Sequence, residues 1–206
     1  EDVFANLFGG GGGGGFGGPR GPQRGQDLTT TQTLDFIDGV KGTTIKLSLR
    51  AGAEATTIKI PAGVTDGQKI KIAGKGNPSP NGGPRGDLVV TIKVRNHQVF
   101  TRDGDNVRVV VPVTIAEAIL GATIQVPLLG EAPVKLKVAP GTPNGRTLRV
   151  KGKGVQGVKQ GDLLATIEIA VPAHVNDKAQ ELLKAFEAEI PEEDPRADLI
   201  SKAGLL

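Results

Sequence analysis

Cysteine and methionine are absent from this 206-residue chain, and histidine occurs only twice. Without cysteine the chain has no disulfide, no thiol nucleophile and no cysteine-ligated zinc, and this absence fits a reducing compartment such as the cytoplasm. The missing methionine indicates a piece of a longer protein. His97 and His174 lie in predicted loops without a nucleophile or carboxylate at a recognised spacing, so no catalytic triad or histidine metal site is supported. We expect neither an enzyme nor a bound cofactor.

Long apolar runs and a strong net charge are also missing. No apolar stretch approaches the ~18 residues that cross a membrane, and no signal peptide is visible, so no membrane partner is expected. The 25 basic and 22 acidic residues are too balanced for a dedicated nucleic-acid binder, although the small positive excess leaves weak polyanion contact open. The length suits two small domains with tails.

An internal repeat is the most informative feature that the sequence contains. The segment 59–76 returns 78 positions later as 137–154, and the two read KIPAGVTDGQKIKIAGKG and KVAPGTPNGRTLRVKGKG. The flanks repeat too, as GTTI at 42–45 with GATI at 121–124 and GDLVVTI at 86–92 with GDLLATI at 161–167. Solenoid repeats usually span roughly 20–50 residues, so this longer period indicates a duplicated small domain.

Three parts of the repeat resemble chemical motifs but have simpler structural explanations. Gly152–Gly157 matches GxGxxG, yet no helix follows and no acidic residue stands ~20 positions on, as a dinucleotide site requires. Lys75 and Lys153 stand between glycines where they could contact phosphate, but turn formation accounts for those glycines. Asp87 and Asp162 follow equivalent glycines, and duplicated acids fit hydrogen bonds at the start of a strand better than acid–base catalysis.

Alternating apolar residues between turns predict an all-β fold of antiparallel sheets. In the segment 43–49, Ile45, Leu47 and Leu49 face one side of a strand, and polar residues face the other. Further strands are expected at 57–60, 69–72, 88–94, 106–113, 123–129, 134–138, 147–150 and 163–171.

Helices are expected at three places only. Short helical turns at 34–40 and 115–120 each precede a repeated glycine, Gly42 or Gly121, that suits a left-handed helix cap. One longer helix follows the last strand, with Asn176 or Asp177 as its cap and Pro191 as its end. Its apolar stripe consists of Ala179, Leu182, Leu183 and Phe186.

The first 26 residues have low complexity. Glycine is unbroken from 9 to 15, with Phe4, Phe8 and Phe16 around it. Such a segment buries too little apolar surface to offset the entropy of ordering, so a flexible tether is expected. It acts either as a plain linker or as a tether whose phenylalanines dock transiently on a groove.

In chain order, these features resemble the C-terminal half of DnaJ-like J-domain co-chaperones. The most specific pieces are PAGV at 61–64, GDLVVTIKV at 86–94 and HQVFTRDG at 97–104. The resemblance covers essentially the whole chain and implies two tandem β-sandwich-like domains that bind unfolded client proteins. The implied parts are a tether at 1–26, a client-binding domain at 27–105, a second domain at 106–174, and a dimerisation helix with an acidic tail at 175–206.

The family also implies partners. Its members deliver clients to a DnaK-type ATPase chaperone, which they stimulate through a J-domain marked by His-Pro-Asp; neither histidine here precedes proline, so this segment lacks that domain. Members with a zinc module carry it in the first domain on CxxC motifs. This chain has only the turn 51–56 there and no cysteine, so it resembles the zinc-free class.

The resemblance implies a client groove in the first domain, lined by Ile45, Leu47, Leu49 and Phe100. Alternation alone favours the simpler explanation that these side chains line the domain core, and both readings stay open. Thr30 and Gln32 stand where relatives often have apolar groove residues, so the groove here is expected to be shallower or more polar.

Some relatives also hold the acidic tail of the partner chaperone with lysines on the 45–48 strand. Only Lys46 is basic there, so docking of that tail is doubtful.

For the terminal helix, Leu182, Leu183 and Phe186 are expected either to pack on their own domain or to make a homodimer. A dimer would join two weak grooves and raise avidity. Two other functions remain as alternatives, a DNA-binding or polyanion-binding accessory protein, against which the balanced charge argues, and a purely structural β scaffold.

Overall fold

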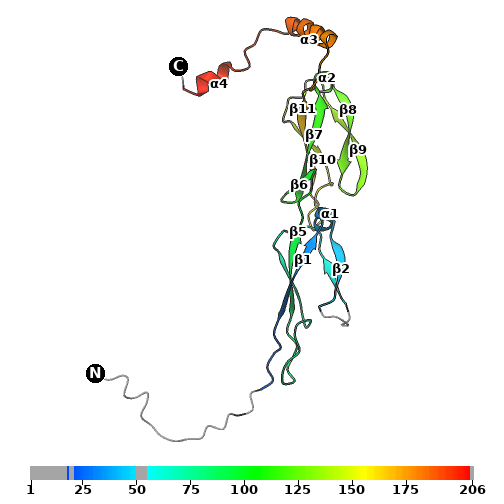
Figure 1. Cartoon of the computed structure of the whole chain (residues 1–206), viewed down its shortest axis with the longest axis vertical. Helices are drawn as coiled ribbons and strands as arrows, with labels where there is room; N and C mark the ends of the chain where they lie inside the picture. Colours follow the sequence, from blue (N-terminus) through cyan, green and yellow to red (C-terminus); the bar gives the residue numbers. More distant parts are fainter. Residues whose placement is uncertain (1–17, 19–20, 50–54, 205–206) are drawn as a thin grey trace, which may run out of the picture.

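The computed structural model describes residue 18 and residues 21–49 and 55–204, and it has two β modules stacked end to end in an elongated molecule (Figure 1). The first module runs from β1 to β5 and the second from β6 to β11, with one short helix in each. Two further helices follow the second module and stand beyond its outer end. The predicted all-β class is confirmed. No helix in the described part of the chain is long and apolar enough to cross a membrane.

The first module places a three-stranded sheet of order β1-β5-β4 against a β2-β3 hairpin. Its strands are β1 (Leu28–Leu34), β2 (Thr43–Leu47), β3 (Thr56–Ile60), β4 (Lys69–Ile72) and β5 (Leu88–Val94). Sheet and hairpin share one core of Leu34, Ile58, Ile60, Val64, Leu88, Val90 and Ile92. The core residues of each strand are two apart, so the alternation in the sequence is what builds this core.

The second module repeats this plan with one extra strand. Its sheet has the order β10-β11-β7-β6, and β8 pairs with β9 in the hairpin. The strands are β6 (Phe100–Asp103), β7 (Asn106–Thr114), β8 (Ala122–Leu128), β9 (Glu131–Val138), β10 (Thr147–Val150) and β11 (Leu163–Ala170). The extra strand β6 was not predicted, because only one of its four residues, Phe100, is apolar and the segment therefore shows no alternation.

The duplicated acids have the structural role that the sequence predicted. One carboxylate oxygen of Asp87 accepts a hydrogen bond from the backbone N–H of Gly74 at 3.0 Å, and Asp162 accepts one from Gly152 at 2.9 Å. Both acids stand at the start of a strand and hold the neighbouring glycine turn in place.

Each sheet also contains one parallel pair, so the expectation of purely antiparallel sheets is wrong there. β1 pairs in parallel with β5, and β7 pairs in parallel with β11. In both modules a helix, a hairpin and another strand separate the two partners along the chain, and such a long connection lets strands run in the same direction. Alternation predicts that a segment is a strand but not which way its neighbour runs.

The two short helices are confirmed as α1 (Phe36–Lys41) and α2 (Ile115–Leu120). Gly42 and Gly121 follow them with φ of 77° and 79°, the positive values that favour glycine. Their ψ values of 160° and 153° place them outside the left-handed helical region, in a region that is essentially restricted to glycine. The residue type was therefore predicted for the right reason, but the cap conformation differs.

α1 joins the two modules. Phe36 and Val40 are 8% and 2% exposed and belong to the core of the second module, and the backbone N–H of Gln156 donates to the carbonyl of Val40 at 3.1 Å. β6 pairs with β7 of the second module. The expected domain boundary between residues 105 and 106 therefore falls between two strands that pair, and this pairing favours a boundary before Phe100.

The terminal helix is α3 (Asp177–Glu189), and Asn176 caps it by accepting from the N–H of Ala179 at 2.8 Å. It ends two residues before Pro191, as predicted. A second short helix, α4 (Ala197–Lys202), lies in the acidic tail and was not predicted. Leu199 and Ile200 are too few to form a recognisable stripe in six residues.

The expected tether at 1–26 is only partly described. Its phenylalanines Phe4, Phe8 and Phe16 lie outside the described residues, as does most of the turn at 51–56 where the zinc module would stand. Residues 21–26, however, run along the loop before β5. The N–H of Gly25 donates to the carbonyl of Pro84 at 2.8 Å, and Asn77 donates to Gln26 at 2.9 Å. The end of the expected tether is thus bound to the first module.

Candidate functional site

Ile45 and Leu47 lie on β2 and face the side that the alternation predicted, and Leu49 lies two residues beyond the end of the strand. Ile45 and Leu47 are half-buried against the first core, and Leu49 is 38% exposed. Lys46, on the opposite face of β2, is exposed. Ile45 and Leu47 therefore contribute to the core and still present apolar surface, and Leu49 adds exposed apolar surface beside them, which leaves both earlier readings open.

Phe100 does not join those three residues. It is 6% exposed and lies in the core of the second module, opposite Val109 in the β6–β7 pair. Its ring centroid is 5.1 Å from that of His97. That Phe100 lines the client groove stays a prediction, and Phe100 also lines the cavity at the module junction described below. The strand that carries Phe100 adds to β7, and that pairing draws the ring into the second core.

β1 presents an unpaired edge on the side away from β5. The N–H of Leu28 donates to the carbonyl of Asp87, and Arg95 donates to the carbonyl of Leu34. Bonded residues alternate along a parallel ladder, so every second residue of β1 directs its N–H and C=O away from β5. These outward residues are Thr29, Thr31 and Thr33, and no strand of the described chain pairs with them.

The second module shows what this edge can hold. β7 is the counterpart of β1, since Leu28 opposite Leu88 matches Val107 opposite Leu163. β6 pairs antiparallel with the outer edge of β7, over residues 106 to 109. Within the described part of the chain the first module has no such strand, and its β1 is the end strand of the sheet. One position beside the first sheet is therefore open where the duplicated fold has a strand.

The core-facing residues of β1 are also less buried than those of β7, which has a strand beside it. Val109 and Val111 of β7 are 2% and 6% exposed, whereas their counterparts Thr30 and Gln32 of β1 are only half-buried. The polar residues noted in the sequence thus stand on the core-facing side of β1, which is less covered than the matching side of β7. The sequence signal for the open edge is the segment aligned with 100–103, because residues 21–24 read GPQR and both Gly and Pro are disfavoured in strands.

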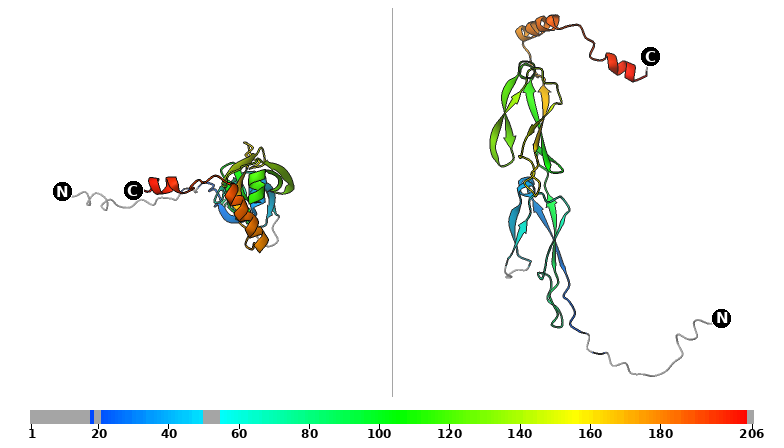
Figure 2. Two further views of the ribbon diagram at one scale, coloured as in Figure 1. Left: turned by 90° about the horizontal axis from the view of Figure 1, so that it is seen from above. Right: turned by 180° about the vertical axis from the view of Figure 1, so that it is seen from behind.

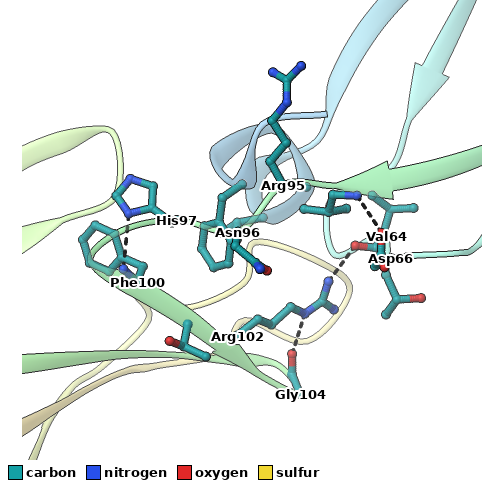
Figure 3. Close-up of a pocket in the computed structure, with 14 residues that line it drawn as sticks. Val64, Asp66, Arg95, Asn96, His97, Phe100, Arg102 and Gly104 are labelled. Atoms are coloured by element: carbon teal, nitrogen blue, oxygen red, sulfur yellow. Dashed lines mark hydrogen bonds between the residues drawn. The ribbon is translucent and has the colours of Figure 1, made fainter. Parts of the chain in front are cut away.

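A cavity of about 660 Å³ opens at the junction of the modules (Figure 3). Phe36, Val64 and Phe100 supply apolar walls, and Asp66 and His97 are among its polar lining. The carboxylate of Asp66 accepts from the N–H of Val94 at 2.9 Å. Residues of both modules line this cavity, so its shape depends on how the modules are joined.

Arg102 fixes that joint. Its Nη1 donates to the carbonyl of Val64 at 2.7 Å and its Nε to that of Gly104 at 2.8 Å (Figure 3). Its Nη2 donates to the carbonyl of Gly63, also at 2.7 Å. Arg102 therefore donates two hydrogen bonds to carbonyls of the first module and one to a carbonyl of the second. The sequence segment of residues 102–104 has a structural explanation in this bridge.

Among the residues that the structure describes, two acids have lowered pKa values. The N–H of Gly74, then Lys71 and then Arg24 lower the pKa of Asp87 to about 2. Lys71 and Arg24 lie 3.1 and 2.6 Å from its second oxygen. Lys153 and, more weakly, Lys41 lower the pKa of Glu131. Since Lys41 lies in α1 and Glu131 in β9, this second cluster also links the modules.

His97 has a structural role. Its Nδ1 accepts hydrogen bonds from the N–H groups of Val99 and Phe100 at 3.0 and 3.2 Å, which shapes the turn into β6. Among the described residues there is no cluster of three side chains able to hold a metal ion.

The predicted apolar stripe of α3 lies in solvent. Leu182, Leu183 and Phe186 are 58%, 55% and 44% exposed, and no residue of α3 is buried. From behind, α3 and α4 are seen to extend away from the second module (Figure 2). Of the two alternatives for this stripe, packing on its own domain is not what the structure has.

Comparison with known proteins identifies relatives along most of the chain. The family described as DnaJ C terminal domain matches residues 28–172. Chaperone protein DnaJ 1 of Streptomyces coelicolor is 51% identical over 148 residues, which are 71% of this chain and 37% of that protein. Chaperone protein DnaJ 2 of Corynebacterium glutamicum is 35% identical over 266 residues, covering 96% of this chain and 67% of that protein.

The chain spans a little over a third of the length of the first of these relatives. The stretch aligned with the Corynebacterium protein is longer than the whole 206-residue chain. That relative therefore carries internal residues that have no counterpart here.

Proposed function

Because the chain belongs to the DnaJ C terminal domain family, we propose that it is the client-binding part of a co-chaperone. It binds unfolded or misfolded polypeptides in extended form and delivers them to a DnaK-type ATPase chaperone. The step that stimulates the ATPase belongs to a J-domain, whose His-Pro-Asp signature is not found in these residues. The chain itself binds clients and catalyses no reaction. We further propose that the protein is cytoplasmic and belongs to the zinc-free class.

The unpaired outer edge of β1 is the observation that carries this function. An unfolded segment has free backbone N–H and C=O groups, and adding it as a strand satisfies them regardless of its sequence. The bound segment would run antiparallel to β1, as β6 runs along β7. Such backbone recognition suits a protein that must accept many clients.

Side-chain contacts would come from two places. Thr30 and Gln32 give β1 a half-covered, polar inner face, and β2 adds the apolar surface of Ile45, Leu47 and Leu49. Successive side chains of an added strand point to opposite faces, so a client with apolar residues at every second position would gain the most binding free energy. This predicts weak binding of segments with alternating apolar residues.

Proline at Thr31 tests the site. The N–H of Thr31 faces the open edge, so Thr31→Pro removes one client bond without removing a bond to β5. The counterpart of Thr33 in β7 is Pro112, so this kind of position tolerates proline in the other module. Binding of a short fluorescein-labelled peptide with alternating apolar residues should weaken about tenfold in Thr31→Pro.

Circular dichroism and the thermal midpoint establish that the variant is folded. Unchanged peptide affinity in folded Thr31→Pro would place the client elsewhere. An absence of peptide binding by the unaltered chain would sink the client-binding function itself.

The second part of the proposal is a homodimer through α3. The exposed stripe of Leu182, Leu183 and Phe186 is too apolar and too continuous to remain in solvent at low cost. A dimer gives each client two open edges, and linked weak sites raise the apparent affinity.

Docking of the partner chaperone's acidic tail on β2 has little support, because Lys46 is the only basic residue from Ile45 to Ser48.

A further inference from the structure

Asp66, in the wall of the junction cavity, carries a charge that its structural role does not require. Its Oδ1 accepts a hydrogen bond from the backbone N–H of Val94, the last residue of β5, at 2.9 Å. In the second module Asn144 stands 78 positions further on, and its Oδ1 accepts from the N–H of Ile169 at the same 2.9 Å. A neutral amide therefore holds the strand in the duplicated copy, so the negative charge of Asp66 is free for another purpose.

Arg102 brings the opposite charge to the same cavity. Its three hydrogen bonds all go to carbonyl oxygens, and it forms no ion pair with any described carboxylate. A guanidinium has five N–H donors, so two of them remain available. Arg102 also lies close to Asp66 along the cavity wall, because it donates to the carbonyl of Val64, only two residues before Asp66.

The other charged side chain that lines this cavity is already matched. Arg95 forms an ion pair with Asp35 at 2.8 Å. Asp66, in contrast, forms no ion pair with another described residue, and only its Oδ1 is used in a hydrogen bond there. The lining thus presents one unmatched cation and one unmatched anion that do not neutralise each other directly. Such a pair suits a small molecule that itself carries both charges.

Aromatic rings form the wall beside these charges. The ring of His97 lies between those of Phe36 and Phe100, with centroids 5.8 and 5.1 Å away and interplanar angles of 58° and 54°. Aromatic rings about 4.5–7 Å apart attract one another in such tilted arrangements, so a further ring would extend this cluster. In Figure 3, His97 and Phe100 lie on one side of the cavity and Asp66 lies on the other.

We propose that this cavity binds a free aromatic amino acid. Arg102 donates to its α-carboxylate, Asp66 accepts from its α-ammonium group, and its ring packs beside Phe36, His97 and Phe100. The cavity volume of about 660 Å³ lies within the range of roughly 300–1,000 Å³ that is usual for small-molecule sites. Because residues of both modules line the cavity, the bound amino acid favours the arrangement in which the modules are joined as they are here.

L-Tryptophan is a suitable probe, because the chain contains neither tryptophan nor tyrosine. When the full 206-residue chain is titrated into L-tryptophan, the fluorescence anisotropy of the amino acid should rise to saturation. Unlabelled L-phenylalanine should compete for the same site and lower the anisotropy. Bound L-tryptophan should also raise the thermal midpoint of the chain, since it stabilises the folded state by mass action.

Asp66→Asn removes the charge and keeps an oxygen that can accept the N–H of Val94, as Asn144 does in the second module. The affinity for L-tryptophan should fall about tenfold or more in this variant. Asn144→Asp is the matched control, because it adds a carboxylate at the equivalent position away from the junction and should leave the affinity unchanged. Circular dichroism and the thermal midpoint without ligand establish that both variants are folded.

A second arm separates a free amino acid from an aromatic residue of a client. N-Acetyl-L-tryptophanamide has the same ring but neither charge, so it should bind at least tenfold more weakly than L-tryptophan. Equal affinity of the two compounds would overturn the proposal and indicate a pocket for aromatic side chains. The proposal is also overturned if L-tryptophan shows no saturable binding, or if folded Asp66→Asn binds it as tightly as the unaltered chain.

Discussion

Arg102 donates a hydrogen bond from Nη2 to the carbonyl oxygen of Gly63 across the module junction, at 2.7 Å. Gly63 has φ of +85°, and a side chain there would bring its Cβ to 3.0 Å from Val155 of the second module. The glycine thus allows the first module to approach closely enough for Arg102 to reach its carbonyl. This hydrogen bond joins a turn of the first module to β6, the strand of the second module that has no counterpart among the described residues of the first.

Removing this bridge should weaken the joint. Arg102→Ala leaves the carbonyls of Gly63 and Val64 without their charged donor, and we expect the free energy of unfolding to fall by about 2–3 kcal/mol in urea titrations. Small-angle scattering should also report a wider range of overall shapes. Arg108→Ala is the control, since the ion pair of Arg108 with Asp103 is exposed and should contribute under about 1 kcal/mol. Equal losses in the two variants would argue against a special role for Arg102.

The lowered pKa of Asp87 predicts an acid-sensitive first module. A carboxyl whose pKa is about 2 when folded and near 4 when unfolded stabilises the fold above about pH 4. That contribution is lost as the pH falls from about 4 to about 2, because the folded carboxylate is then protonated. Asp87→Asn removes the charge, so the urea midpoint of the unaltered chain should exceed that of the variant at pH 6 and approach it near pH 2. A midpoint difference that is constant over this range would contradict the assignment.

The apolar face of β2 should contribute to client affinity. Leu47→Ser with Leu49→Ser removes partly exposed apolar surface, and we expect peptide affinity to drop about tenfold or more in fluorescence anisotropy. Because Leu47 also packs on the core, circular dichroism must establish a folded variant. Lys46→Ser, on the opposite face of the same strand, should bind as the unaltered chain does. If both variants bind equally well, β2 is not part of the client site.

Charges in the α3 stripe should separate the proposed dimer. Leu183→Asp with Phe186→Asp places two carboxylates where apolar side chains would meet a partner, so the sedimentation coefficient should shift to that of a monomer. The thermal midpoint of the β modules should stay unchanged, since no residue of α3 is buried in one chain. Lys184→Ala lies off the stripe and should remain dimeric. A dimer that persists in the double variant would rule out α3 as the contact.

The sequence predicted elements whose pattern is local. Leu88–Val94, Thr147–Val150 and Ile115–Leu120 occur with the predicted bounds, because alternation or a glycine end marks each of them within a few residues. The packing of Phe100 in the second core was not predicted, because the four residues of β6 show no apolar alternation and their partner lies in the following strand.

By itself, the sequence determined the duplication, the alternation that buries one face of each strand, and the positions where only glycine fits. These depend on backbone geometry and on side-chain order along a few neighbouring residues. Only the tertiary structure decided that β6 covers β7 while β1 keeps an open edge, and that α1 is covered while α2 is not. The cover of α1 comes from residues far along the chain, and the strand beside β7 has no apolar alternation, so neither difference follows from a local pattern that the two copies share.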